Sequence, residues 1–208
     1  MELFFKGITV RFFVPAIAAI FVLIAPQTAW AQRVSILGQI TAFKDGTLTV
    51  KSRSGEIVKI TVRKRTRFRS LTRAKFSDVK KGDFIASAGM RQKDGTLKAI
   101  EVRFFPAGTR HPGEVHREYR FGPDSRMTNA TVDAIIGGIS GRTFKVKYEG
   151  GEQTIFVPKD VLVMRQRRGT IKLLKLGAHV SVVARKTKEG QIKAIRIKVG
   201  MNGLVPPT

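Results

Sequence analysis

After residue 31, apolar and polar residues alternate along the chain in short runs separated by turn-forming residues. In the first half these runs cover residues 35–43, 47–52, 56–62, 83–91 and 97–104. A period of two predicts β-strands with one buried face. The Asp-Gly pairs at Asp45-Gly46 and Asp94-Gly95 are typical of hairpin turns. The pattern predicts an all-β protein, with one short helical turn between residues 70 and 81.

The same series of runs occurs twice. "DGTLKAIEV" at Asp94–Val102 recurs as "EGQIKAIRI" at Glu189–Ile197, and "TLTVKSRSGE" from Thr47 recurs as "TFKVKYEGGE" from Thr143. "KKGDFIASAG" from Lys80 matches "KLGAHVSVVA" from Lys175, at an offset of 95 residues. A fixed order at a fixed offset indicates a duplication. We expect one copy at residues 32–105, a Pro-, Gly- and charge-rich linker at 106–126, and a second copy at 127–208.

Five short strands in about 70 residues are typical of a small closed barrel, which leaves few strand edges exposed. The sequence therefore predicts two tandem small OB-like β-barrels. A two-layer sandwich is the alternative for each copy.

The strand and turn motifs also carry a family resemblance. The pattern Gly38-x-Ile40, followed by "GTLTV", "KKGDFI" and "DGTLKAIEV", resembles a repeated domain of unknown function in exported bacterial proteins. "SRMTNATVDAI" and "GMNGLVPP" are similar to segments of alphaproteobacterial proteins with two copies of it. The resemblance implies a small OB-like barrel for each copy, and it carries over no catalytic residue.

Residues 1–31 have the pattern of a signal peptide. Lys6 and Arg11 precede or border an apolar stretch at residues 12–25, and Ala29-Trp30-Ala31 provides a cleavage site. We therefore expect export to the periplasm or the medium. An uncleaved N-terminal membrane anchor is the alternative. The absence of cysteine excludes disulfides and thiolate chemistry, which suits a bacterial periplasm.

The charge is strongly positive and belongs to the exported part. The net charge is +24 and the isoelectric point about 11.3, yet 42% of the residues are apolar, so the chain is expected to fold. Residues 1–31 contain only Lys6, Arg11 and Glu2 as charged residues, which leaves +23 on residues 32–208. Such a balance indicates an anionic partner or a highly solvated surface.

Two runs of arginine concentrate this charge. If residues 62–70 form one strand, its arginines all lie on one face, and the second copy has a basic run at the matching place. The candidate anion-binding residues are Arg63, Arg65, Arg67, Arg69, Arg165, Arg167 and Arg168. A guanidinium fork suits phosphate or carboxylate oxygens. The alternative is a solvated face that keeps the protein soluble.

The predicted function is that of an exported non-enzymatic protein that presents basic faces to an anionic envelope component: phospholipid, lipopolysaccharide or acidic polysaccharide. Contact with a membrane surface is part of this prediction. A structural module that binds an acidic protein is the alternative. Nucleic acid is a weaker candidate because of export and the 8% aromatic content, and we expect Phe68 to be buried in the core. The sequence gives no oligomeric state.

Neither catalysis nor a cofactor is expected. No recognised nucleophile motif is present. His111, Glu114, His116 and Glu118 are close in sequence, but the spacing of the two histidines does not match the zinc-binding helix motif. We therefore predict no metal site.

Overall fold

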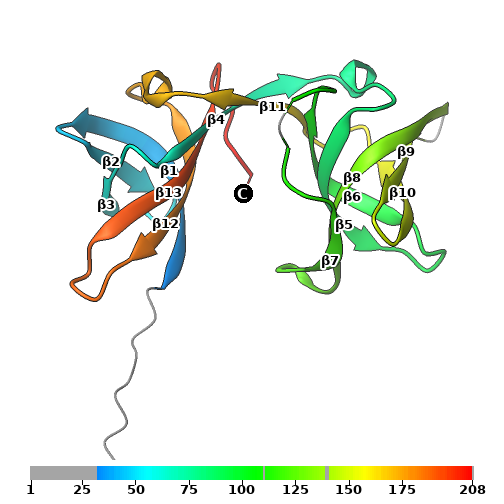
Figure 1. The fold of residues 1–208 in the computed structure, drawn as a ribbon, viewed down its shortest axis with the longest axis horizontal. Coiled ribbons are helices and arrows are strands. Elements are labelled where there is room, and N and C mark those ends of the chain that lie inside the picture. The colour runs from blue at the N-terminus through cyan, green and yellow to red at the C-terminus, as the bar shows by residue number, and fades with distance from the viewer. Residues whose placement is uncertain (1–31, 110, 139–140, 208) are drawn as a thin grey trace, which may run out of the picture. The chain divides into compact units, whose positions relative to one another are not determined.

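The computed structural model describes residues 32–109, 111–138 and 141–207 as strands joined by turns and two single 3₁₀ turns (Figure 1). The predicted all-β class is confirmed. The strands of the first copy are β1 (Arg33–Lys44), β2 (Thr47–Ser52), β3 (Ile57–Thr61), β4 (Arg67–Ala74), β5 (Phe84–Arg91) and β6 (Leu97–Phe105). The predicted signal peptide lies outside the described residues.

The remaining strands repeat this order after one additional strand. They are β7 (Val115–Tyr119), β8 (Gly122–Gly138), β9 (Gly141–Tyr148), β10 (Gly151–Val157), β11 (Val163–Gly169), β12 (His179–Lys186) and β13 (Ile192–Gly200). The 3₁₀ turns are η1 (Phe76–Asp78) and η2 (Ile171–Leu173), between β4 and β5 and between β11 and β12. A helical turn after the fourth strand of each copy agrees with the sequence pattern.

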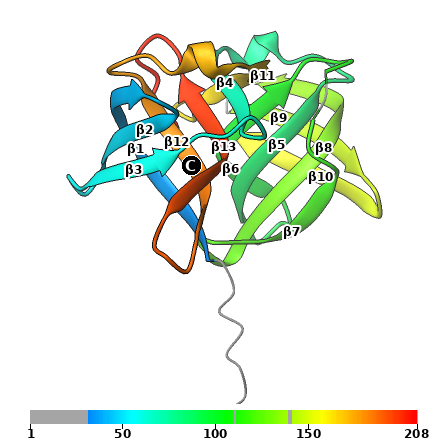
Figure 2. The same ribbon diagram turned by 60° about the vertical axis from the view of Figure 1, so that its left-hand side comes forward.

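Ten of the strands close into two rings of five (Figure 2). Ring A contains β1, β2, β3, β13 and β12, and it closes where Lys193 of β13 lies beside Thr61 of β3. Ring B contains β5, β6, β10, β9 and β8, and it closes where Ile155 of β10 lies beside Leu97 of β6. Both closing pairs are parallel, and the other neighbours in each ring are antiparallel.

Each ring encloses its own hydrophobic core, and each core combines the two sequence copies. Ile40, Leu48 and Val50 of the first copy pack in ring A with Val182 and Ile197 of the second. In ring B, residues such as Ile85 and Phe104 pack with Val132, Phe144 and Ile155. Each ring thus takes its first three strands from one copy and its last two from the other.

Residues 32–105 and 127–208 therefore do not each close a ring by themselves, as the duplication led us to expect. β4 carries the chain from ring A to ring B, β11 returns it, and the two pair antiparallel from Phe68 opposite Gly169 to Ala74 opposite Val163 (Figure 1). The internal sequence similarity described above explains why such an exchange is possible. Because both copies have the same pattern of apolar strands, the final hairpin of either copy can complete either ring.

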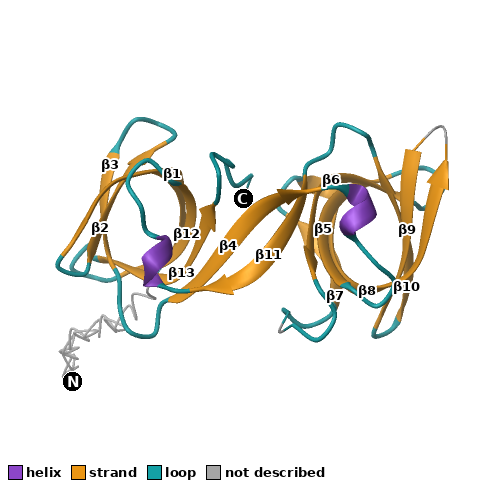
Figure 3. Cartoon of the chain, turned by 90° about the horizontal axis from the view of Figure 1, so that it is seen from above, coloured by secondary structure: helices purple, strands orange, loops and turns teal. Residues whose placement is uncertain are grey.

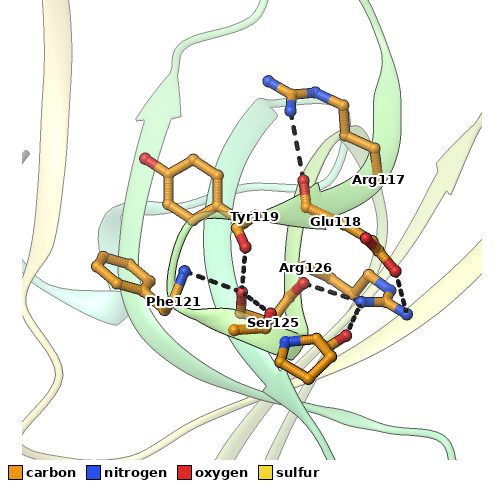
Figure 4. Close-up of polar contacts among 8 residues, drawn as sticks. Arg117, Glu118, Tyr119, Phe121, Ser125 and Arg126 are labelled. Carbon is orange, nitrogen blue, oxygen red and sulfur yellow. Dashed lines mark hydrogen bonds and ion pairs between the residues drawn. The ribbon is translucent and has the colours of Figure 1, made fainter.

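The segment predicted to be a linker contains a hairpin. β7 pairs with β8, and Ser125 closes the turn: its hydroxyl donates to the carbonyl of Tyr119 at 2.7 Å and accepts from the amide of Phe121 at 3.2 Å (Figure 4). Arg126 and Glu118 form an ion pair at 3.8 Å beside it. The segment predicted to be a linker, residues 106–126, thus contains strand β7 and the beginning of β8.

Both 3₁₀ turns pack against the core of a ring (Figure 3). Phe76 of η1 is buried in ring B and stacks on Phe144, with ring centroids 4.5 Å apart. Leu173 and Leu174, at the end of η2, pack against the core of ring A. Apolar side chains of η1 are thereby added to the core of ring B, and those at the end of η2 are added to the core of ring A.

Candidate anion-binding site

The four alternating arginines of residues 63–69 do not share one strand. β3 ends at Thr61 and β4 begins at Arg67, so Arg63 and Arg65 lie in the connection. Buried Thr66 holds this bend: its hydroxyl accepts from the amide of Arg63 at 2.9 Å and donates to the carbonyl of Ala194 at 3.1 Å. The expected row of four is wrong, because the chain must turn here before β4 leaves ring A.

Arg67 and Arg69 lie on β4 and point away from the core of ring A. Phe68 between them is buried in that core, as the alternation predicted. β4 pairs in parallel with β13, which places Arg67 beside Arg196 and Arg69 beside Lys198. Residues paired in this way project to the same face of a sheet. Two strands from different copies therefore place four cations side by side.

The second arginine run lies on the neighbouring strand β11. Arg168 lies directly opposite Arg69, so it shares the face of the four cations. Arg165 and Arg167 project to the opposite face of β11. The two runs, expected on two separate barrels, thus lie on adjoining strands.

Arg165 has a structural environment. Its guanidinium is 3.8 Å from Asp78 in an ion pair and lies over the ring of Phe104, at 5.3 Å from the centroid. The side chain is half-buried. These contacts fix Arg165 against ring B, whereas Arg167 and Arg168 are exposed.

β6 adds a buried ion pair to this surface. Arg103 Nε and Glu101 Oε1 are 3.2 Å apart, and both side chains are almost inaccessible to solvent. Arg103 lies beside Met164 of β11, in the same run of sheet that contains β4 and β13. We call the group the basic cluster and define it as Arg67, Arg69, Arg103, Arg168, Arg196 and Lys198, with Glu101 as its carboxylate.

Burial and mutual repulsion perturb two members of the basic cluster. Burial lowers the pKa of Lys198 well below its usual range; Arg103 lowers it further, and Glu101 opposes the change. The pKa of Arg196 is also lowered, by burial first and then by Arg103, Arg67 and Arg69. Charged groups removed from water beside like charges have a high electrostatic energy. Negatively charged oxygens placed here would lower it.

The sequence reasoning missed Arg103, Arg196 and Lys198. The local signal was present, because Arg196 and Lys198 alternate with Ile197 and Val199, which predicts that they point outward. What the sequence does not contain is the pairing of β13 with β4. That pairing brings Arg196 and Lys198 beside Arg67 and Arg69.

The histidines of the predicted linker contact aromatic rings and hydroxyls. The imidazole of His111 stacks on Phe84, with centroids 3.7 Å apart. His116 stacks on Tyr148, and its Nδ1 is 3.0 Å from the hydroxyl of Thr128. Within residues 32–109, 111–138 and 141–207, no three His, Asp or Glu side chains gather as a metal site. No helix in that same part of the chain has the length and apolar character needed to cross a membrane.

A comparison with known protein families gives a match for part of the chain. Residues 38–103 match the model of a family described as a domain of unknown function (DUF5666). No curated protein and no solved structure matches the chain. The matched segment runs from β1 to β6 and contributes strands to both rings, so it does not coincide with one ring.

Proposed function

We propose that this is an exported, non-enzymatic protein that binds an anionic component of the bacterial envelope through the basic cluster. The observation that carries the proposal is the pairing of Arg67 with Arg196 and of Arg69 with Lys198 on one face of β4 and β13. Phosphate and carboxylate oxygens are the groups that such cations bind.

The balance of charge supports the proposal. Among the described residues, the charges that lower the pKa of Arg196 are four arginines: Arg103, Arg67, Arg69 and Arg33. Glu101 is the acidic side chain that acts on Lys198, against three cations. Cations therefore outnumber acidic side chains around Arg196 and Lys198, and a ligand that brings negative charge would offset their mutual repulsion.

The arrangement of the cations suits a ligand with several charges. Side chains two residues apart on a strand are about 7 Å apart, and adjacent strands are about 4.8 Å apart. Arg67, Arg69, Arg196 and Arg168 therefore form a grid over three strands, and Lys198, which is only 6% exposed, lies beside Arg69. Such a grid binds a polyanion or a charged surface at several points, which favours lipopolysaccharide, an acidic polysaccharide or anionic phospholipid.

The fold part of the proposal is a pair of OB-like barrels that have exchanged strands. Each ring has five strands, a 3₁₀ turn before its fourth strand in OB order, and a parallel pair between the third and fifth strands, as in an OB-fold. We further propose that residues 1–31 direct export and are removed. Their charged start, apolar stretch and Ala29-Trp30-Ala31 support this.

The test is binding of residues 32–208 to lipopolysaccharide, to an acidic polysaccharide and to anionic or neutral lipid vesicles over a series of salt concentrations. These residues include every strand of both rings, so they form the unit to purify. We expect binding to at least one anionic probe, with an affinity that falls steeply as salt rises. Absence of binding to all anionic probes at low salt would overturn the proposal and favour an acidic protein as partner.

A further inference from the structure

Two large apolar side chains are exposed at η2: Ile171, its first residue, and Leu176, which follows it in the chain. Ile171 is 46% exposed and Leu176 is 73% exposed, the latter more than any other large hydrophobic residue in the described part of the chain. Both belong to the connection from β11 to β12, with the sequence "TIKLLKLG" from Thr170. Large apolar side chains gathered in one exposed patch mark sites of protein or membrane contact, whereas single exposed ones are common.

The connection is held firmly. Leu173 and Leu174 turn inward and pack against the core of ring A. The amide of Gly177 donates to the carbonyl of Ile40 at 2.9 Å, and the amide of Ile40 donates to the carbonyl of Ala178 at 3.0 Å. Gln39 donates from its side chain to the carbonyl of Gly177. Since these contacts fix both sides of Leu176, its exposure is a property of the fold.

Exposed cations are close in sequence to the two apolar side chains. Lys172 and Lys175 are exposed within the connection, and Arg167 and Arg168 are exposed at the end of β11. No acidic residue occurs between Asp160 and Glu189. Apolar tips among basic residues are the combination with which proteins enter the interface of an anionic bilayer.

The first copy lacks this combination at the equivalent place. By the offset of 95 residues, Leu176 corresponds to Lys81 and Ile171 corresponds to Phe76. Phe76 is buried in the core of ring B, and Lys81 is an exposed cation. The two copies therefore have the same fold at η1 and η2, but the second copy alone of the two presents apolar side chains there.

We infer that the η2 connection is a membrane-contact loop, in which Leu176 and Ile171 enter the headgroup region of an anionic phospholipid bilayer while Lys172 and Lys175 contact lipid phosphates. This inference rests on the proposed function and names phospholipid as the ligand class. The area of two side chains is small, so the insertion is shallow and reversible, and it adds to the attraction between charges.

The test measures cosedimentation of residues 32–208 with vesicles of equal parts phosphatidylglycerol and phosphatidylcholine, compared with phosphatidylcholine alone. We expect Leu176→Gln to weaken binding to the anionic vesicles about tenfold, the scale expected for one leucine leaving an apolar phase. Ile57→Gln is the matched control, because Ile57 is 55% exposed on β3 of the same ring. It should bind like the unmodified protein.

Leu176→Lys separates insertion from simple charge attraction. It introduces the residue that the first copy has and adds a cation, so attraction alone predicts tighter binding. Insertion predicts weaker binding. Tighter or unchanged binding of this variant would overturn the inference and leave the proposed function intact.

The fluorescence of a tryptophan at position 176 reports directly whether this position enters the bilayer. Trp30 is the single tryptophan of the sequence, and it lies outside residues 32–208. In a protein of residues 32–208 that carries Leu176→Trp, all tryptophan fluorescence therefore comes from position 176. Its emission should shift to shorter wavelength with anionic vesicles. An unchanged spectrum on bound protein, or binding to lipopolysaccharide or polysaccharide without any to vesicles, would overturn the inference alone. If the protein binds none of the anionic probes, the proposed function is overturned as well.

Discussion

Arg69 of β4 and Arg168 of β11 lie directly opposite one another in the antiparallel pair that joins the two rings. Like charges in this position destabilise a sheet, and Lys198 on the other side of β4 adds a third cation beside Arg69. Buried Leu71 and Met164 lie farther along the same two strands, where Leu204 packs against them. The crossing is therefore stabilised at its centre by apolar packing, while one end concentrates positive charge.

Removal of two cations from β4 should weaken the binding of anions. Arg67→Gln combined with Arg69→Gln should cost about 2 kcal/mol, or about thirtyfold in affinity for an anionic surface at low salt. Titration of the variant with the anionic probe that binds best measures this. The matched control is Arg63→Gln with Arg65→Gln, which removes the same charge from the turn before β4. Equal losses in both variants would show that net charge and not the basic cluster determines binding.

Glu101 should be important for stability. Its carboxylate is 2% exposed and is 3.2 Å from Arg103. Glu101→Gln leaves buried cations without this counter-charge, so we expect the free energy of unfolding to fall by about 3 kcal/mol. Urea denaturation measures it. Glu56→Gln removes an exposed carboxylate from ring A and should change stability by less than about 0.5 kcal/mol. Similar values for the two variants would contradict the proposed role of Glu101.

Because of Lys198, the free energy of unfolding should change with pH in the alkaline range. Its pKa is lowered in the folded protein, mainly by burial, whereas in the unfolded chain it is about 10.4. Between these two values the unfolded chain binds more protons, so stability rises with pH through this range. The penalty of the buried charge is fully present below the folded-state pKa.

Lys198→Met removes this titration. The difference in unfolding free energy between the variant and the unmodified protein should therefore change as pH rises toward about 10.4, in the direction that favours the unmodified protein. Denaturation at a series of pH values from neutral to alkaline measures the difference. A difference that is independent of pH would show that the folded-state pKa of Lys198 is not lowered.

Two fragments test whether each ring combines strands from both halves of the chain or whether each half closes a ring by itself. Residues 74–164 contain every strand of ring B and its whole core, from Phe76 to Val163. We expect this fragment to fold as a monomer with a cooperative transition. Residues 32–105, the first sequence copy, contain three strands of one ring and two of the other, so they should not fold as a monomer. Dispersed amide spectra and gel-filtration volumes measure both outcomes, and a folded monomer of residues 32–105 would contradict the strand exchange.

The sequence by itself determined the elements that depend on neighbouring residues. Alternation located β1, β2, β3, β5 and β6, and turn residues such as Asp45-Gly46 and Asp94-Gly95 joined them into hairpins. Alternation also placed Phe68 in a core, and the basic composition identified anion binding as the function to test. Each of these inferences uses contacts between residues that are close in sequence.

Only the tertiary structure decided which strands meet at long range. The sequence pattern of residues 62–70 suggested one strand with four arginines, but the bend at Thr66 separates Arg63 and Arg65 from Arg67 and Arg69. The pairing of Arg69 with Lys198 joins residues of different copies. Because the two copies offer the same apolar strand faces to each other, local patterns do not select a partner. The path of β4 and β11 between the rings selects it, and with it the position of every cation in the basic cluster.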